Sequence, residues 1–363
     1  MIKETLKEMS ELNGASGFEH EISNYVIEEL KRLNIDNYFL DTMGNLYIKV
    51  EGTNADSPIV LLDAHMDEPS FMVKYIDDEG YIYVVQTGLF SPNILLGQRV
   101  RIQTKEGTVK GCFGIKSYHI SEGSTTPILD DMWIDVGAKS KKDVLKLGIK
   151  PGFPVLFDEP FVELANGFVM GKAFDNRTGC TVLLEVIREL AQNRAESTVY
   201  LTFSVQEELM LRGANVIFNG IKKFFGKIPD FCIAYDICLG GDTPQVKKNK
   251  APIELGKGAG IKVLDRSRAS AHFINIVPRK VIDYFLQLCE KENIPFQNDF
   301  LSGTTNANMF AIEDIGVLTG GLSIPCRYTH SPVEIVCLND LKNVIDLSIS
   351  AVRNMHLLMD HYE

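Results

Sequence analysis

Apolar residues recur every three to four positions in several segments of the chain, a spacing that predicts amphipathic helices. These segments are 2–13, 21–33, 277–292 and 341–359. Segment 59–62, Ile-Val-Leu-Leu, is instead a continuous apolar run, which is typical of a strand buried on both faces. The pattern therefore predicts a fold that mixes helices with buried strands.

The pattern changes between about residues 70 and 163, where helical spacing is nearly absent outside 141–147. Short apolar segments alternate there with turn sequences such as Asp-Asp-Glu-Gly. They lie at 71–76, 81–86, 99–104, 109–115 and 133–136. This alternation indicates a small antiparallel β module.

Strands and helices alternate again after residue 167. The predicted elements are a helix at 181–190 and strands at 198–205 and 231–235. We therefore predict an α/β domain formed by residues 1–69 and 164–363, which an inserted β domain at 70–163 interrupts.

Length and charge limit the class of protein. With 363 residues the chain exceeds the roughly 250–300 residues at which single cores stop growing, so two domains are expected. Acidic residues outnumber basic ones by 48 to 37, which argues against nucleic-acid and polybasic membrane-surface partners. No apolar run approaches the roughly 18 residues that span a bilayer, and residues 1–8 lack the apolar core of a secretion signal.

The seven cysteines are scattered and contain no Cys-x-x-Cys pair. A disulfide scaffold or a thiolate zinc site would need paired, closely spaced thiols. We therefore expect reduced cysteines in a cytoplasmic protein.

Two candidate ligands, His65 and Asp67, follow the apolar run 59–62. In open α/β sheets, ligands gather beyond the carboxyl ends of strands. Residues two apart on an extended chain share one face, and a neighbouring carboxylate is a common way to orient a metal-binding histidine. A solvated strand end explains this pair, taken alone, equally well.

Four further carboxylates follow predicted strands or open helices. Asp175 opens a helix, where it could also serve as an N-cap, and Asp236 follows the run 231–235. Glu207 and Glu208 follow the strand at 198–205, and adjacent side chains on an extended chain point to opposite sides. One glutamate could then bind a metal while the other stays free as a general base.

A second histidine, His330, lies in the late segment Arg-Tyr-Thr-His-Ser-Pro. Two histidines and three carboxylates, namely Asp175, Asp236 and one of the two glutamates, thus follow strands or loops at the expected edge of the sheet. Such nitrogen and oxygen ligands suit two divalent ions such as zinc or cobalt. A carboxylate that bridges two ions roughly 3.5–4 Å apart would complete a two-metal hydrolase site.

This ordered set of motifs resembles the glutamyl aminopeptidase or tetrahedral aminopeptidase family of cytosolic dinuclear metallopeptidases, which has also been labelled endoglucanase. The resemblance runs from segments 14–19 and 41–45 to segment 330–334, and so covers essentially the whole chain.

The resemblance implies a role for each candidate residue. His65 and Asp236 would hold one metal, Glu208 and His330 would hold the other, and Asp175 would bridge the two. Asp67 would support His65. Glu207 would be the general base that takes a proton from the attacking water and delivers it to the leaving amine.

The resemblance also implies an architecture and an activity. The fold would be a zinc-peptidase-like α/β sandwich with an inserted PDZ-like dimerisation domain, and the substrates would be short peptides. Members of the family assemble into hollow dodecamers, so a homo-oligomer is expected, with the apolar segments 71–73 and 81–85 as a contact surface.

Four departures separate this chain from the family pattern. Asn176 stands where a second Asp is frequent, and Leu209-Met210 stands where Val-Gly is usual. Pro69-Ser70 replaces an aliphatic-Gly pair, and Thr-Thr-Asn-Ala at 304–307 replaces Gly-Thr-Asp-Ala. None removes a candidate ligand or the base, but Met210 bears on the shape of the substrate pocket.

Two other hypotheses remain open from the sequence. In a glycoside hydrolase, Glu207 and Glu208, or Asp67 and Glu68, would form an acid–base pair, but such pairs stand about 5–10 Å apart and the histidines would have no task. The chain could also be a non-catalytic, metal-binding paralogue.

An acidic substrate side chain would need a cation in the pocket. The candidates are Lys172, Arg212, Lys257 and Arg327.

Overall fold

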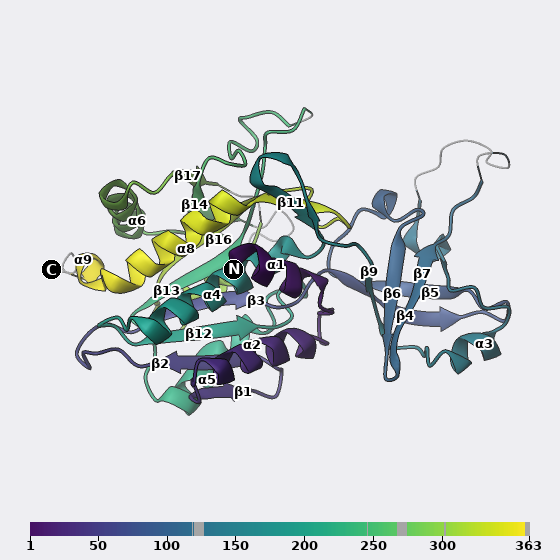
Figure 1. Ribbon diagram of the computed structural model, residues 1–363, viewed down its shortest axis with the longest axis horizontal. Helices are drawn as coiled ribbons and strands as arrows, with labels where there is room; N and C mark the ends of the chain where they lie inside the picture. Colours follow the sequence, from purple (N-terminus) through teal and green to yellow (C-terminus); the bar gives the residue numbers. More distant parts are fainter. Residues whose placement is uncertain (118, 120–126, 245, 267–273, 301–302, 360–363) are drawn as a thin grey trace.

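We describe the protein from a computed structural model, for residues 1–117, 119, 127–244, 246–266, 274–300 and 303–359. The chain forms a large α/β lobe and a small β lobe, which lie side by side in Figure 1. The strands of the small lobe come from the middle of the sequence, between two parts of the large lobe.

A mixed sheet forms the centre of the large lobe. Its strands are β1 (Tyr38–Leu40), β2 (Leu46–Val50), β3 (Val60–His65), β10 (Val162–Glu163), β11 (Phe168–Gly171), β12 (Val199–Ser204), β13 (Phe231–Leu239), β14 (Ala259–Lys262), β17 (Phe296–Asp299), β18 (Leu318–Arg327) and β19 (Glu334–Cys337). The strand order is β1-β2-β12-β3-β13-β18-β19-β11-β10, and β14 joins β18 to β17. A separate two-stranded sheet pairs β15 (Leu264–Arg266) with β16 (Ile274–Ile276).

Helices cover both faces of this sheet. They are α1 (Ile2–Glu11), α2 (His20–Arg32), α4 (Phe174–Gln192), α5 (Ala214–Phe225), α6 (Arg279–Glu292), α7 (Ala307–Phe310), α8 (Leu338–Arg353) and α9 (Met355–Met359), with a 3₁₀ helix at Ala165–Gly167. Helices α1, α2, α4, α6 and α8 share one hydrophobic core with one face of the sheet, while α5 and α7 share another with the opposite face. The large lobe is therefore a three-layer sandwich.

Strand β3 shows why the first three residues of a buried strand are all apolar. Val60, Leu62 and Ala64 pack into the core beneath α4, whereas Leu61 packs into the core beneath α5. Successive side chains on a strand point to opposite faces, so a strand covered on both sides needs apolar residues at every position. The polar residues of this strand are left for its carboxyl end.

The small lobe is a closed β barrel with the strand order β4-β5-β8-β7-β6-β9. The bounds are β4 (Ser70–Ile76), β5 (Ile82–Thr87), β6 (Arg99–Thr104), β7 (Gly107–Phe113), β8 (Ile134–Asp135) and β9 (Pro154–Phe157), with α3 (Lys141–Lys146) and 3₁₀ helices at Pro92–Ile94 and Leu129–Asp131. Its own core centres on Phe71, which packs against Phe90, Phe113 and Phe157.

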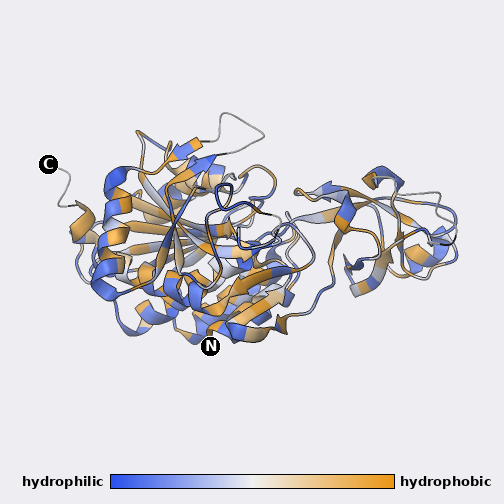
Figure 2. Cartoon of the chain, turned by 90° about the horizontal axis from the view of Figure 1, so that it is seen from above, coloured by the Kyte–Doolittle hydropathy of each residue, from blue (hydrophilic) through white to orange (hydrophobic). Residues whose placement is uncertain are grey.

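The barrel stands apart from the sandwich in both views (Figures 1 and 2) but is tied to it by side chains. Arg101 on β6 donates to the carbonyl of Glu11 at 2.9 Å, and Gln103 donates to the carboxylate of Glu21 at 2.9 Å. The barrel strand β6 is therefore anchored to the end of α1 and the start of α2.

The structure confirms the mixed α/β fold and places a β module where the spacing predicts one. Strand β10 pairs with β11 in the large sheet. The domain boundaries at residues 70 and 163, and the PDZ-like character of the module, stay predictions.

Two predicted element ends were wrong. Strand β13 does not end before Asp236 but continues to Leu239, because it stays paired with β18 along its length. The long C-terminal helix is interrupted at Asn354, between α8 and α9.

Among the described residues, none of the helices is both long and apolar enough to cross a membrane.

Candidate metal centre

The candidate ligands meet because several strands of the sheet run in the same direction. Strands β3, β12, β13 and β18 are parallel neighbours, and β11 has the same direction because it is antiparallel to β19. Their carboxyl ends lie at one edge of the sheet, where ligands of α/β proteins bind. His65 ends β3, the other candidate ligands except Asp236 follow a strand end, and Asp236 lies three residues before the end of β13.

We call His65, Glu207 and Asp236 the inner side of the centre. The Nε2 atom of His65 lies 3.9 Å from Glu207 Oε2 and 4.0 Å from Asp236 Oδ1. All three residues are buried, with His65 only 1% exposed. One ligand atom from each lies within 4.8 Å of the others, so the three could share one metal ion.

We call Glu208 and His330 the outer side. The Nε2 atom of His330 lies 3.6 Å from Glu208 Oε1, and the His330 side chain is 34% exposed. The other ring nitrogen, Nδ1, lies 2.9 Å from the carbonyl oxygen of Leu89, just after the barrel strand β5. A carbonyl in this position fixes the tautomer in which Nε2 is free to bind a metal.

Asp175 lies between the two sides. Its Oδ1 is 3.3 Å from His65 Nε2, and its Oδ2 is 3.4 Å from His330 Nε2. Asp175 lies in the first turn of α4 with non-helical backbone angles, and its own N-cap position is taken by Ala173. The position between two imidazoles suits a bridging ligand better than the alternative of a helix cap.

Asp67 organises the site without joining the group of ligands. Its carboxylate lies 3.4 Å from Nδ1 of His65 and accepts hydrogen bonds from the backbone N–H groups of Glu207 at 2.9 Å and Glu208 at 3.2 Å. Ser16 donates a further bond of 2.6 Å. Asp67 thus orients the histidine and holds the turn that carries both glutamates.

That turn corrects one expectation about the glutamates. They do not continue β12 in extended form: Gln206 has a φ of +54°, and the N–H of Leu211 donates to the carbonyl of Glu207. The alternation of a strand therefore does not separate their side chains. They nevertheless diverge, with Glu207 directed to His65 and Glu208 to His330.

Burial and neighbouring charges shift the acidity of these groups. Burial by itself lowers the pKa of His65, but the charge of Glu207 and the carboxylates of Asp175 and Asp67 outweigh it and raise that pKa well above its ordinary range. Burial raises the pKa of Glu208 to about 8.

Burial also raises the pKa of Asp236 to about 7 and that of Glu207 well above its usual value. For Asp175 burial acts in the same direction, but hydrogen bonding to His330 and His65 holds its pKa well below the ordinary value. Such shifts mark a site crowded with carboxylates.

The residues present fit divalent metal ions. The buried atoms His65 Nε2 and Glu208 Oε1 have no hydrogen-bond partner in the part of the chain that the structure describes, which is unfavourable unless a further group binds them. Within the described residues, no lysine or arginine forms an ion pair with Asp175, Glu207, Glu208 or Asp236. Cations would supply the missing positive charge.

A second possible metal group combines His65, Asp175 and Glu208. The two groups share His65 and together contain every predicted ligand except His330, which contacts Asp175 and Glu208. The structure therefore brings the predicted ligands into one cluster.

Two of the residues that depart from the family pattern lie close to the candidate ligands in sequence and differ in their surroundings. Asn176 is buried and uses its whole amide, since Nδ2 donates to the carbonyl of Tyr235 at 2.8 Å and Oδ1 accepts from Gly179 at 3.0 Å. A carboxylate at this position could not donate the first bond. Met210 is 58% exposed with a φ of +69°, a backbone conformation that favours glycine.

Three of the four candidate cations already have partners. Lys172 is buried and donates to both carboxylate oxygens of Glu68 at 2.8 Å. Arg327 pairs with Asp242, and Arg212 donates to the side chain of Gln206 at 2.9 Å. Lys257 is exposed. The structure thus gives no candidate cation a free position beside the ligands.

Two features of the centre could not be read from spacing. Asp63, buried two residues before His65, accepts hydrogen bonds from Thr202 at 2.6 Å and from Asn306 at 2.7 Å. Glu334 accepts bonds from the backbone N–H groups of two predicted ligands. For Glu334, the only signal in the sequence was an acidic residue four positions after His330.

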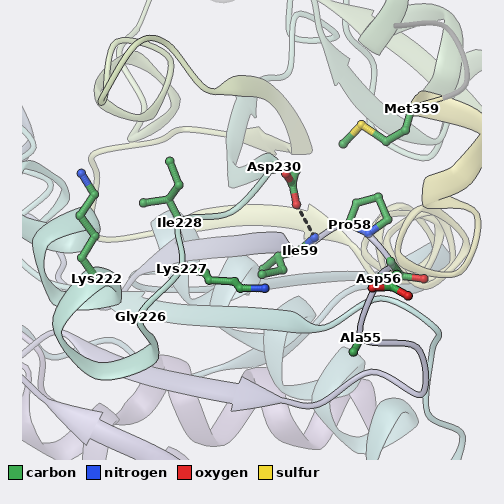
Figure 3. A pocket seen from close by; sticks show the side chains of 11 residues that line it. Ala55, Asp56, Pro58, Ile59, Lys222, Gly226, Lys227, Ile228, Asp230 and Met359 are labelled. Atoms are coloured by element: carbon green, nitrogen blue, oxygen red, sulfur yellow. Dashed lines mark hydrogen bonds between the residues drawn. The ribbon is translucent and has the colours of Figure 1, made fainter.

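A hollow of about 750 Å³ lies at the other end of the strands (Figure 3). Lys222, Lys227, Asp56 and Asp230 are among its lining residues, and Asp230 accepts a hydrogen bond from the backbone N–H of Ile59. The described residues that line it include no histidine or glutamate. This hollow lies at the amino ends of β3 and β13 and is separate from the candidate centre.

Comparisons with known proteins agree with this arrangement. The family model described as M42 glutamyl aminopeptidase matches residues 44–347. The lysyl aminopeptidase of Pyrococcus furiosus is 32% identical over 353 residues, which cover 95% of each chain.

Solved structures share the whole fold. An aminopeptidase from the archaeon Desulfurococcus kamchatkensis has a TM-score of 0.91 and 34% identity, covering 100% of this chain and 98% of its own. The TET1 peptidase of Pyrococcus horikoshii, described as assembling into a tetrahedron or a large octahedral shell, has a TM-score of 0.86 and 29% identity, covering 98% and 100%. The chain therefore belongs to the M42 family of aminopeptidases and is a peptidase hydrolase.

Proposed function

We propose that the protein is a dinuclear aminopeptidase that removes N-terminal residues from short peptides. One observation carries this proposal: Asp175 lies between two imidazoles, His65 and His330, which face it through Nε2 at 3.3 and 3.4 Å. A carboxylate shared by two histidine-containing sides is the arrangement that a two-metal hydrolase needs. M42 peptidases are metal-dependent, which supports the same proposal.

The residues divide into two sets of ligands around Asp175. His65 and Asp236 would hold one divalent ion, and Glu208 and His330 would hold the other. The donors are imidazole nitrogens and carboxylate oxygens, which suit zinc or cobalt. The chemistry that these ions supply when bound is polarisation of the scissile carbonyl and a lower pKa for the attacking water.

Glu207 is proposed as the general base. Its carboxylate faces the inner side, and burial raises its pKa, which makes it a stronger base than an exposed glutamate. In the proposed reaction Glu207 takes one proton from the attacking water and delivers it to the leaving amine. Asp67 holds the N–H groups of both glutamates and so fixes the direction of that carboxylate.

The glycoside hydrolase alternative finds no support in these contacts. It would leave His65 and His330 without a role, although both point a ring nitrogen at Asp175. It would also give no reason for the unpartnered Nε2 atom of His65.

We further propose a homo-oligomer with the barrel as a dimerisation domain. Of the expected contact segments, Phe71 and Val73 are buried in the barrel core and offer no surface, whereas Val85 and Tyr81 are 47% and 38% exposed. TET1 peptidase is described as forming large shells, which supports this proposal. Sedimentation that finds only a monomer at micromolar concentration would contradict it.

A pair of isosteric variants tests the mechanism. Glu207→Gln should keep two ions per subunit while kcat on an aminoacyl-nitroanilide falls by about 10²–10⁴, the usual contribution of a positioned acid–base group. Glu208→Gln should lower metal occupancy instead, because an amide is a weaker ligand than a carboxylate.

Elemental analysis and kcat on the same preparations separate the outcomes. Metal loss in Glu207→Gln but not in Glu208→Gln would exchange the two roles. Full activity in both variants, or faster turnover of aryl glycosides than of aminoacyl substrates, would contradict the proposed function.

A further inference from the structure

One buried carboxylate connects two segments that carry predicted ligands. Glu334 Oε2 accepts a hydrogen bond of 3.0 Å from the N–H of Asp175, and Glu334 Oε1 accepts one of 2.9 Å from the N–H of His330. Glu334 begins strand β19, where it is paired with Gly171 at the end of β11, and is 2% exposed. It therefore lies between the bridging ligand and the outer side.

Both segments need an external partner to keep their shape. Asp175 has non-helical angles within α4, so its N–H group is not part of the regular helical ladder. In the other segment, Tyr328 and His330 have φ values of +63° and +57°, which L-residues adopt at a cost. A loop that combines two such residues is held by its surroundings and not by its own preference.

A carboxylate is the side chain that satisfies both N–H groups. It offers an acceptor at each oxygen, whereas an amide offers one acceptor and one donor. With glutamine at position 334, one of the two backbone N–H groups would face an NH₂ group. Among the described residues, Glu334 has no lysine or arginine as an ion-pair partner, so pairing with a cation does not explain its burial.

We propose that Glu334 is a positioning residue for metal binding, which fixes the distance between the Asp175 carboxylate and the His330 imidazole. Those two groups, 3.4 Å apart, face the ion that the outer side would hold. This role rests on the proposed function. Groups behind the ligands typically change metal affinity by 10–100-fold when they are removed.

The alternative is that Glu334 only stabilises the fold, as any buried hydrogen-bonded side chain does. Glu185 provides a matched control, because it is also buried and bound to Thr5 and Arg188 through hydrogen bonds, but it is not among the candidate ligands or their hydrogen-bond partners. Glu185→Gln should lower stability and leave metal affinity unchanged. A structural role for Glu334 predicts the same result for Glu334→Gln.

The experiment uses the full-length chain, stripped of metal and titrated with Co²⁺ in competition with a chelator. For Glu334→Gln we expect the dissociation constant of the ion that the outer side would hold to rise about 10–100-fold. The dissociation constant of the other ion should change less. Because the ligands themselves are intact, kcat should recover at saturating metal, unlike that of Glu207→Gln. Glu334→Asp, which keeps two acceptors on a shorter side chain, should lie between the wild type and Glu334→Gln.

The outcomes separate this role from the proposed function. A wild-type chain that binds no divalent ion would overturn both. A wild-type chain with two ions, and with the same affinities in Glu334→Gln and Glu334→Asp, would overturn only the positioning role. If Glu334→Gln does not fold, as judged by circular dichroism, Glu334→Asp decides: wild-type affinity in that variant overturns the role.

Discussion

The inner and outer sides of the metal centre use the same types of ligand but are built differently. On the inner side, His65 and Asp236 lie on strands β3 and β13, which are paired in the middle of the sheet. On the outer side, His330 lies in a loop after β18 with a φ of +57°. Its imidazole is oriented by the carbonyl of Leu89, which follows the barrel strand β5. One side is fixed by the core, and the other by contacts between loops.

This difference teaches where the site is rigid and where it can adjust. A strand that is covered on both faces cannot move without disrupting the core, so the inner ligands are pre-arranged. The outer ligands depend on Glu334, Leu89 and the turn that carries Glu208. We therefore expect the inner ion to bind more tightly and the outer ion to be the first that a chelator removes.

The largest contrast is expected when each histidine is removed from metal-free protein. His65→Ala removes the positive partner that the buried carboxylates of Asp175, Asp67 and Glu207 share, and should lower the free energy of unfolding by about 3–5 kcal/mol. His330 is 34% exposed, so His330→Ala should cost less than about 1 kcal/mol.

Chemical denaturation of the two chelator-treated variants measures this contrast. Circular dichroism before denaturation shows whether each variant is folded. Equal losses at both positions would mean that the inner side is not the more strongly coupled half of the site.

A smaller effect is expected from the network behind the inner side. Asn306 donates to Asp63 at 2.7 Å and to Ser204 at 2.9 Å, so Asn306→Asp would place a second carboxylate against Asp63. We expect a loss of about 1–3 kcal/mol at neutral pH, the penalty for an unsatisfied buried polar group. The exchange Asp63→Asn with Asn306→Asp restores one amide and one carboxylate, and should recover most of it.

The pH dependence of this variant has a definite sign. Burial raises the pKa of Asp63 to about 6 in the folded protein, although hydrogen bonds from Thr202 and Asn306 oppose the rise. A carboxyl group whose pKa is raised in the folded protein lowers the free energy of unfolding when it ionises. This loss is absent below its unfolded pKa of about 4 and complete above its folded pKa. The loss in Asn306→Asp, relative to wild type, should therefore grow from pH 4 to pH 7, and a loss that shrinks over this range would contradict the network.

The two sides also differ in how far the sequence predicts the contacts that support them. The inner strands are visible in the sequence, because 59–62 and 231–235 are continuous apolar runs followed by polar residues. The candidate ligands of both sides, His330 included, could be proposed from pattern as a set, and resemblance to a family added their roles. The outer side depends on a contact between distant parts of the sequence, because the carbonyl of Leu89, which orients His330, lies 241 positions from it.

Backbone partners leave no trace in residue type, and this limits prediction more than the choice of ligands does. Glu334 acts through two N–H groups, which every residue except proline carries. The sequence of the turn that carries Glu207 and Glu208 resembles a continued strand, because its left-handed residues, Gln206, Met210 and Leu211, are not glycine. The Asp63–Asn306 contact joins positions 243 apart, and neither residue is remarkable alone.

The smallest predicted effect tests whether the barrel supports the outer side. Gly88 precedes Leu89, has a φ of +106°, and a Cβ there would meet the backbone of Pro69 at 2.8 Å. Gly88→Ala must therefore displace the segment whose carbonyl orients His330.

Gly97→Ala is the matched control, because Gly97 also has a positive φ, of +75°, but has nothing within 4 Å of the added carbon. Both variants should lose about 1–2 kcal/mol from the left-handed backbone. Only Gly88→Ala should also weaken the second Co²⁺ ion, by up to about tenfold, the lower end of the range for groups that orient a ligand. If both variants bind two ions as wild type does, the barrel does not contribute to the outer side, and the contrast between the sides rests on burial alone.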